Sequence, residues 1–164
     1  MKTYQTSSSL ETKKLGAKIA KEILNGKLGN TARVIALVGN LGAGKTTFTQ
    51  GFMRGLGVRG KVTSPTFVIV KRYALRKPLP LLEGELEGER FSHVYHADLY
   101  RINNAKHLAS LEFKKILKDP ANIVLVEWAD RTRRIFPKET VWVRFECGEK
   151  GNERILTISS RTLL

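Results

Sequence analysis

Short apolar runs alternate along this chain with segments whose apolar residues recur at helical spacing. Apolar runs of about four to eight residues between turn residues are typical of buried parallel strands, and residues with period-two alternation or β-branching also favour strands. The sequence therefore predicts strands within residues 33–40, 61–75, 93–101, 122–130, 140–147 and 153–159.

Helical spacing, together with start and stop signals, predicts three helices. The first has Ser8 as an N-cap, with Glu11 three residues later to complete a capping box, and Gly26 at its end. The predicted helices are residues 7–26, residues 45–57, which Gly57 closes, and residues 103–119, which stop before Pro120.

The alternation of strands and helices predicts an α/β fold with a mixed, mainly parallel β-sheet flanked by helices. The turn-like "GEKGN" between the last two strands predicts a closing β-hairpin at the C-terminus. The polar segment 76–90 contains proline and glycine and is interpreted as an exposed loop or hairpin. Because no repeat or long linker divides residues 1–164, we expect a single domain.

The charge balance is strongly basic, with 29 Lys and Arg against 15 Asp and Glu and a net charge of +14. Such a charge favours nucleotides, nucleic acid or an acidic partner, although a solvated basic surface is an equally simple interpretation. No apolar run approaches the ~20 residues that span a bilayer, so a membrane protein is excluded. The lone Cys147 and the absence of a signal-peptide core favour a cytoplasmic protein.

The stretch "GNLGAGKT" at residues 39–46 matches the pattern G-x-x-x-x-G-K-[ST] of a phosphate-binding P-loop. Its glycines allow successive backbone N–H groups to point at phosphate oxygens, and the next helix presents its N-terminus to the same anion. In this pattern Lys45 reaches the β- and γ-phosphates and the Thr46 hydroxyl binds Mg²⁺. Since the loop lies between a predicted strand and a predicted helix, we interpret the chain as a P-loop NTPase-like domain.

Two carboxylates stand at the ends of predicted strands, where a P-loop protein needs groups to hold Mg²⁺ and to position water. Glu127 follows the apolar run at 123–126, and Asp98 ends "HVYHAD". Asp98 shares a strand face with His96 by two-residue alternation, and His96 is interpreted as a packed, hydrogen-bonded residue. The alternative role for either carboxylate is a salt bridge or a helix cap.

Three further residues are candidates for nucleotide-dependent behaviour. Ser64 and Thr66, in "TSPTF", follow the P-loop helix, where many P-loop proteins keep a phosphate-sensing switch; a plain turn into a strand is the alternative. Trp128 either stacks on a base or a partner or packs in the core.

Four linked motifs, "GNLGAGKTTFTQGF", "VTSPTFVIVKRY", "HADLYR" and "LVEWADR", resemble in order and spacing the TsaE (YjeE) family. This family is the ATPase component of bacterial tRNA threonylcarbamoyladenosine synthesis. The early "TSSSLETKKLG" resembles the family's opening helix, so the resemblance covers roughly residues 6–160.

The resemblance implies a P-loop ATPase that binds ATP and Mg²⁺ and associates with the TsaD and TsaB proteins, which perform the threonylcarbamoyl transfer. ATP hydrolysis would reset that complex between turnovers, and tRNA would be met indirectly through it. Lys45, Asp98 and Glu127 would be catalytic, and Thr46, Glu127 and Asp98 would hold the metal. The nucleotide-binding residues would be Ser9 near the adenine, Trp128 by the nucleotide or partner, and Gly42, Ala43, Gly44, Lys45, Thr46 and Thr47 around the phosphates.

Two other functions fit a P-loop on a basic α/β protein. A small-molecule kinase needs an acceptor pocket and an arginine-bearing lid. The segment 76–90 carries Arg76, Lys77 and Arg90 but is rich in glutamate and leucine, which is unlike such a lid. A nucleotide-gated RNA-binding protein would bind tRNA tightly and in a salt-sensitive way without partners.

Overall fold

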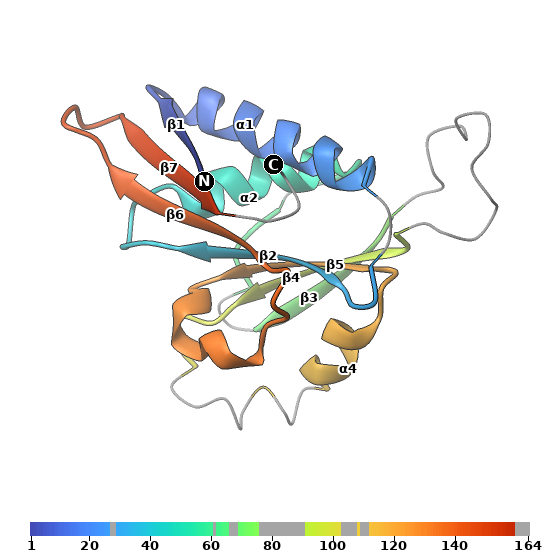
Figure 1. Cartoon of the computed structure of the whole chain (residues 1–164). Coiled ribbons are helices and arrows are strands. Elements are labelled where there is room, and N and C mark those ends of the chain that lie inside the picture. The colour runs from blue at the N-terminus through green and yellow to red at the C-terminus, as the bar shows by residue number, and fades with distance from the viewer. Residues whose placement is uncertain are drawn as a thin grey trace.

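The computed structural model describes residues 1–26, 29–60, 62–65, 69–75, 91–102, 108 and 112–159. Within them a seven-stranded sheet carries helices on both faces (Figure 1). The strands are β1 (Lys2–Thr6), β2 (Arg33–Val38), β3 (Val70–Ala74), β4 (His93–Asp98), β5 (Asn122–Glu127), β6 (Val141–Cys147) and β7 (Arg154–Ser159). The helices are α1 (Ser9–Leu24), α2 (Lys45–Gly55), α4 (Phe113–Lys118) and the 3₁₀ segment η1 (Ala129–Ile135).

The strand order is β1-β7-β6-β2-β5-β4-β3. Strand β2 runs parallel to both β5 and β6, and β4 runs parallel to β5, whereas β1, β3 and β7 pair antiparallel with their neighbours. Strands β6 and β7 form the closing hairpin. The predicted mixed, mainly parallel α/β sheet is therefore confirmed.

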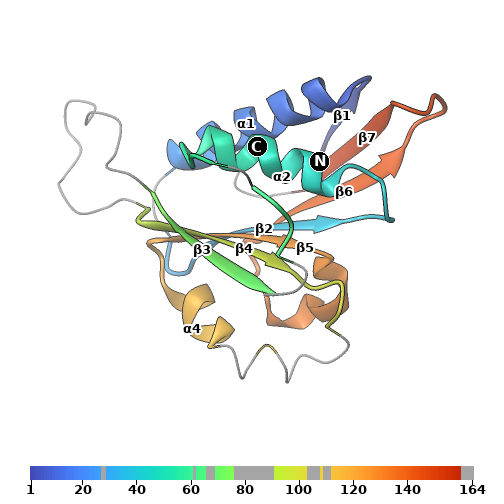
Figure 2. The same cartoon turned by 180° about the vertical axis from the view of Figure 1, so that it is seen from behind.

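The central strands are buried because both faces of the sheet are covered. Every residue of β5 and nearly every residue of β2 is buried. On one face the core packs against α1 and α2, and on the other it packs against α4 and η1 (Figures 1 and 2). None of the described helices combines the length and the apolar character needed to cross a membrane.

The predicted first helix is confirmed together with its cap. The Ser8 hydroxyl accepts from the Glu11 backbone N–H at 3.2 Å, and the Glu11 carboxylate accepts from the Ser7 N–H at 2.8 Å. The end of α2 is also as predicted: the N–H groups of Gly57 and Val58 return to carbonyls of the last turn, which terminates the helix.

Other predicted elements differ from the structure in extent. Strand β1 was not predicted, and the described strand within 61–75 covers only Val70–Ala74. Of the predicted helix 103–119, the structure gives α4 at Phe113–Lys118. Residues 76–90, interpreted above as a loop or hairpin, lie outside the described residues. So does most of the range 103–111 of the predicted third helix.

Helices α1 and α2 approach each other closely through glycines. A Cβ built on Gly16 of α1 would lie 2.4 Å from the Phe48 carbonyl oxygen, and one on Gly51 of α2 would lie 2.0 Å from the Lys13 carbonyl oxygen. These neighbours are backbone atoms, which do not move away as flexible side chains do. The two helices therefore pack backbone to backbone, and this contact fixes how α2 lies on the sheet.

We expect Gly51→Ala to destabilise the protein by about 1–3 kcal/mol through overpacking. Alanine gains up to ~1 kcal/mol of helix propensity over glycine, but the backbone clash outweighs it. Urea unfolding measures the difference. The control is Gly29→Ala, a glycine-to-alanine change outside the helices, because the nearest atom to a Cβ at Gly29 is the Thr31 carbonyl oxygen at 4.0 Å. Equal stabilities of the two variants would contradict the close approach of the helices.

Candidate nucleotide-binding site

The glycine-rich loop joins the end of β2 to the start of α2 at the carboxyl edge of the parallel strands. Gly39 has φ 146° and a Cβ there would lie 2.5 Å from the Phe145 carbonyl oxygen, so the loop passes directly against β6. Gly44, at φ 99°, is the N-cap of α2 and supplies no side chain to the free N–H groups of the first turn. This helix end therefore presents backbone donors and a positive dipole to an anion.

Lys45 is the first residue of α2 and is 5% exposed. Its ammonium donates to the carbonyls of Gly39 at 2.6 Å and Asn40 at 2.8 Å, and it lies 3.8 Å from the centre of the Trp128 ring. Burial lowers the pKa of Lys45, while the negative charges of Glu127, Asp130 and Asp98 act in the opposite direction. The ammonium is thus held at the loop, close to carboxylates and poorly hydrated.

Glu127, the last residue of β5, is 2% exposed and receives side chains from two other elements. The Thr46 hydroxyl donates to its Oε2 at 2.8 Å. The Thr49 hydroxyl donates to its Oε1 at 3.1 Å, and His96 Nε2 of β4 lies 3.0 Å from the same oxygen. The structure therefore brings together Thr46 and Glu127, which were both predicted as metal ligands.

Asp98 ends β4 directly opposite Glu127 in the register of the parallel pair. Its Oδ1 accepts from the Tyr100 backbone N–H at 2.9 Å, and its Oδ2 accepts from the Ser64 hydroxyl. Asp98 therefore links the predicted switch residue Ser64 to the strand end beside Glu127. Thr66, the other predicted switch residue, lies outside the described residues.

Trp128 follows Glu127 with a left-handed backbone, φ 59°, which is uncommon for a bulky side chain. Its ring lies 5.1 Å from the ring of Tyr100 and also faces Lys45. The Arg131 guanidinium lies 5.6 Å from the Tyr100 ring and 5.8 Å from the Trp128 ring. Trp128 is half-buried at the edge of the site, so it has both a packing role and an accessible side.

The other predicted binding residues differ in how the fold places them. Ala43 is buried in the loop and Thr47 is half-buried in the first turn of α2, while Gly42 is exposed. Ser9 is exposed at the start of α1, which begins at the same end of the molecule as the loop (Figure 1).

Three residues that contact this site were not assigned to it from sequence. Arg154, the first residue of β7, donates to the Gly42 carbonyl at 3.2 Å and so ties the hairpin to the loop. Thr49 and His96 contact Glu127. The signals for these two were available: Thr49 lies about one helical turn after Thr46, and His96 alternates with Asp98.

The donor set suits a nucleotide with Mg²⁺. A hydroxyl and a carboxylate oxygen converge between Thr46 and Glu127, and Mg²⁺ is commonly held by one or two such oxygens together with substrate phosphates. In the part of the chain that the structure describes, no group of three or more His, Cys, Asp or Glu residues forms a metal site by itself.

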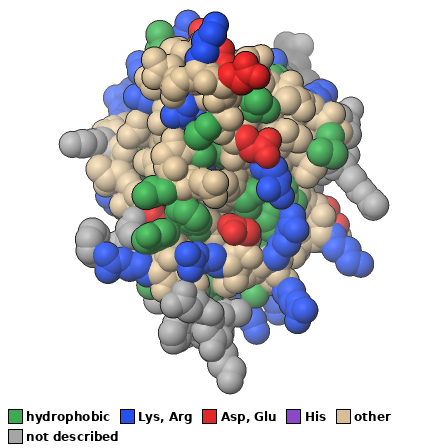
Figure 3. Space-filling view, turned by 90° about the vertical axis from the view of Figure 1, so that its left-hand side faces the viewer, with side chains coloured by type: hydrophobic (Ala, Val, Ile, Leu, Met, Phe, Trp, Pro, Cys, Tyr) green, Lys and Arg blue, Asp and Glu red, His purple; other side chains and the backbone are tan. Residues whose placement is uncertain are grey.

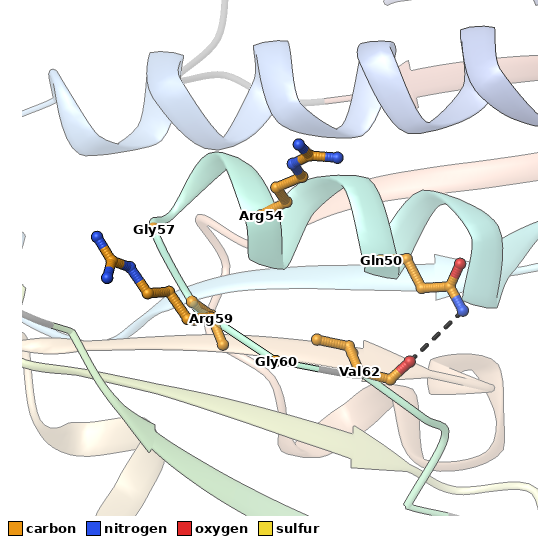
Figure 4. Close-up of a pocket in the computed structure, with 7 residues that line it drawn as sticks. Gln50, Arg54, Gly57, Arg59, Gly60 and Val62 are labelled. Carbon is orange, nitrogen blue, oxygen red and sulfur yellow. Dashed lines mark hydrogen bonds between the residues drawn. The ribbon is translucent and has the colours of Figure 1, made fainter.

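Charge on this face of the molecule is mixed. Figure 3 views the end at which β2 and β5 terminate, and Lys and Arg side chains gather there around a few acidic ones. A separate groove lies around the opposite end of α2 (Figure 4). The lining residues of that groove are Gln50, Arg54, Gly57, Val58, Arg59, Gly60 and Val62, none of which was predicted to bind nucleotide.

Comparison with known families gives one match over most of the chain. The family described as "Threonylcarbamoyl adenosine biosynthesis protein TsaE" matches residues 6–156. The loop, Asp98, Glu127 and Trp128 all fall within that range.

Individual relatives agree with this match. The chain is 32% identical over 133 residues to the tRNA threonylcarbamoyladenosine biosynthesis protein TsaE of Haemophilus influenzae, covering 81% of this chain and 74% of that protein. It is 30% identical over 156 residues to the protein of that name from Mycobacterium bovis, covering 91% and 81%. The alignment to the Synechocystis protein of that name is 39% identical and covers 60% of this chain and 55% of the relative.

Among solved structures, the chain resembles YdiB of Bacillus subtilis with a TM-score of 0.65 and 28% sequence identity. The superposition covers 97% of this chain and 84% of the YdiB chain. The similarity therefore extends through the whole sheet and its helices, and is not limited to the glycine-rich loop.

Proposed function

This chain belongs to the TsaE family, and from that premise we propose that it binds ATP with Mg²⁺ and hydrolyses the ATP in support of tRNA threonylcarbamoyladenosine synthesis. The observation that carries the proposal is the group formed by Lys45, Thr46 and Glu127 at the N-terminus of α2. These residues come from two elements far apart in sequence, and the Thr46–Glu127 hydrogen bond of 2.8 Å joins them.

In the proposed binding mode, the backbone N–H groups of residues 42–46 and the dipole of α2 hold the phosphates. Lys45 exchanges its carbonyl contacts for phosphate oxygens, and Thr46 and Glu127 hold the metal. When bound, Mg²⁺ neutralises charge on the phosphates and orients them. Asp98, one strand away, assists with the metal or orients water.

Adenine recognition is assigned to the rim of the site. We place Trp128 beside the nucleotide or the partner and the start of α1, near Ser9, beside the adenine. The switch role belongs to the segment with Ser64 and Thr66. It is supported by the Ser64–Asp98 hydrogen bond, because a change at the metal site that moves Asp98 also changes a contact of this segment.

We further propose that the chain acts on a complex of the TsaB and TsaD proteins, with ATP turnover resetting that complex between catalytic cycles. The transfer to tRNA is then performed by the partners, and tRNA meets this chain only through them. Hydrolysis is expected to be slow in the isolated chain, because small P-loop proteins often obtain a charge-stabilising group from a partner. The sequence offers no clear arginine of its own for that role: Arg101 and Arg131 are as easily interpreted as ion-pair partners of Asp98 and Asp130, and Arg131 lies over the Tyr100 and Trp128 rings.

Reconstitution tests this function. ATP, threonine, bicarbonate, tRNA and the other pathway proteins are combined with and without the chain, and modified adenosine is counted over time. We expect yields well above one product per TsaB–TsaD complex only when the chain is present. Lys45→Ala is the matched control and should give the yield of the reaction without the chain. Equal yields in all three reactions would contradict the proposal.

A further inference from the structure

The two oxygens of the Glu127 carboxylate have different surroundings. Oε2 accepts from the Thr46 hydroxyl at 2.8 Å, on the side of the glycine-rich loop. Oε1 is contacted by His96 Nε2 at 3.0 Å and by the Thr49 hydroxyl at 3.1 Å. The side chains of His96 and Thr49 are fully buried, so water does not compete for Oε1.

The backbone explains how His96 reaches this oxygen. Asp98 lies opposite Glu127 in the parallel register, and His96 precedes Asp98 by two residues on the same face. His96 is therefore a diagonal neighbour of Glu127 on the adjacent strand. A diagonal pair is farther apart than a directly opposite one, and the imidazole is long enough to reach the Glu127 carboxylate. Thr49 reaches the same oxygen from α2, where its hydroxyl also lies 3.0 Å from the Lys45 carbonyl oxygen, so its single hydrogen is shared between these two acceptors.

The chemistry of the pair assigns the donor. A carboxylate oxygen accepts hydrogen bonds, so we assign the hydrogen of this contact to His96 Nε2. Among the described residues His96 Nδ1 has no hydrogen-bond partner. Glu127 is therefore the polar side chain that the buried imidazole contacts. A ring that only filled space in the core would not need such a contact.

We propose that His96 and Thr49 are positioning residues for Glu127: they hold Oε1 so that Oε2 is directed at Thr46 and the metal. The inference rests on the proposed ATPase function. Neither residue touches the nucleotide in this role. A free glutamate side chain has several rotamers, and restricting it to one costs conformational entropy. If His96 and Thr49 already hold one rotamer before the metal binds, metal binding no longer carries that entropic cost.

A matched pair of substitutions separates positioning from packing. His96→Gln keeps an N–H donor at nearly the reach of Nε2, whereas His96→Met has a similar length and shape but no donor. In His96→Met we expect Mg²⁺-dependent ATP turnover to fall by about 10- to 100-fold, the usual cost of losing a partner of a metal ligand. His96→Gln should recover most of that loss.

Metal affinity gives a readout besides activity. Mn²⁺ binding in the presence of ADP, followed by electron paramagnetic resonance, should weaken about 10- to 100-fold in His96→Met. ADP binding without metal should stay within about twofold of the parent, because backbone N–H groups supply it. If His96→Met fails to fold, Thr49→Val replaces it, with Thr49→Ser as the control that retains the hydroxyl.

A double-mutant cycle decides between the two roles. In the Glu127→Ala background, His96→Met should cause no further loss of metal binding, because the group it positions is gone. Additive losses, or equal losses in His96→Gln and His96→Met, would overturn the inference. If the parent protein hydrolyses no ATP, the proposed function is contradicted instead. If the parent is active and Glu127→Ala is defective but His96→Met is unaffected, only the positioning role is contradicted.

Discussion

Replacing Lys45 with alanine is expected to reduce ATP turnover to background. Lys45 is 5% exposed, and the negative charges of Glu127, Asp130 and Asp98 raise the pKa of its ammonium against the lowering effect of burial. A fixed charge of this kind stabilises phosphate charge that builds in the transition state, and one such group is typically worth about 10²–10³ in rate. Because the isolated chain is expected to be slow already, a loss of this size leaves nothing measurable.

The fold should survive the change. The Lys45 ammonium donates to two loop carbonyls, and the Gly39 and Asn40 residues that carry them are only partly buried or exposed, so water replaces the lost contacts. Lys45→Met is the control that retains the apolar stem against Trp128. Turnover and circular dichroism are measured on both variants. A folded Lys45→Ala protein with the turnover of the parent would show that the phosphate assignment is wrong.

Much of the fold was predictable because its central strands carry strong signals. The runs that became β2 and β5 are continuously apolar, which follows from burial on both faces. Strand β1 gave no such signal: it is an edge strand with only Thr6 buried, and it is ordered by pairing with β7. Its position depends on a strand more than a hundred residues later, which local pattern does not reveal.

The candidate site was predictable to the level of its motifs but not of its contacts. The loop and Glu127 follow from spacing, because the chemistry requires those residue types after a buried strand. The contact between His96 and Glu127 requires β4 to lie directly beside β5. This follows from the strand order of the sheet, which the local sequence pattern does not reveal. The approach of Arg154 to Gly42 likewise requires the hairpin to return to the loop.

Replacing Glu127 has the second large expected effect, and the structure indicates whether ATP hydrolysis or ATP binding is affected more. Its side chain is buried at the end of β5 with Thr46, Thr49 and His96 around it, so it is held before any ligand binds. The phosphates, in contrast, are expected to bind mainly to backbone N–H groups of residues 42–46 and to Lys45. Losing the carboxylate should therefore damage hydrolysis more than ATP binding.

We expect Glu127→Ala to lower the rate of ATP hydrolysis by about 10²–10³, equivalent to roughly 3–4 kcal/mol for one preorganised electrostatic contact. ATP affinity should fall by less than about tenfold, because the phosphate contacts of the loop persist. Glu127→Gln is the matched variant, since it retains the shape and the contacts to Thr46 while removing the charge. Isothermal titration of ATP to each variant gives the affinity, and steady-state hydrolysis in the presence of the TsaB and TsaD proteins, where turnover is high enough to follow such a loss, gives the rate. Affinity and rate that fall together by the same factor would mean that Glu127 contributes to ground-state binding and not to the hydrolytic step.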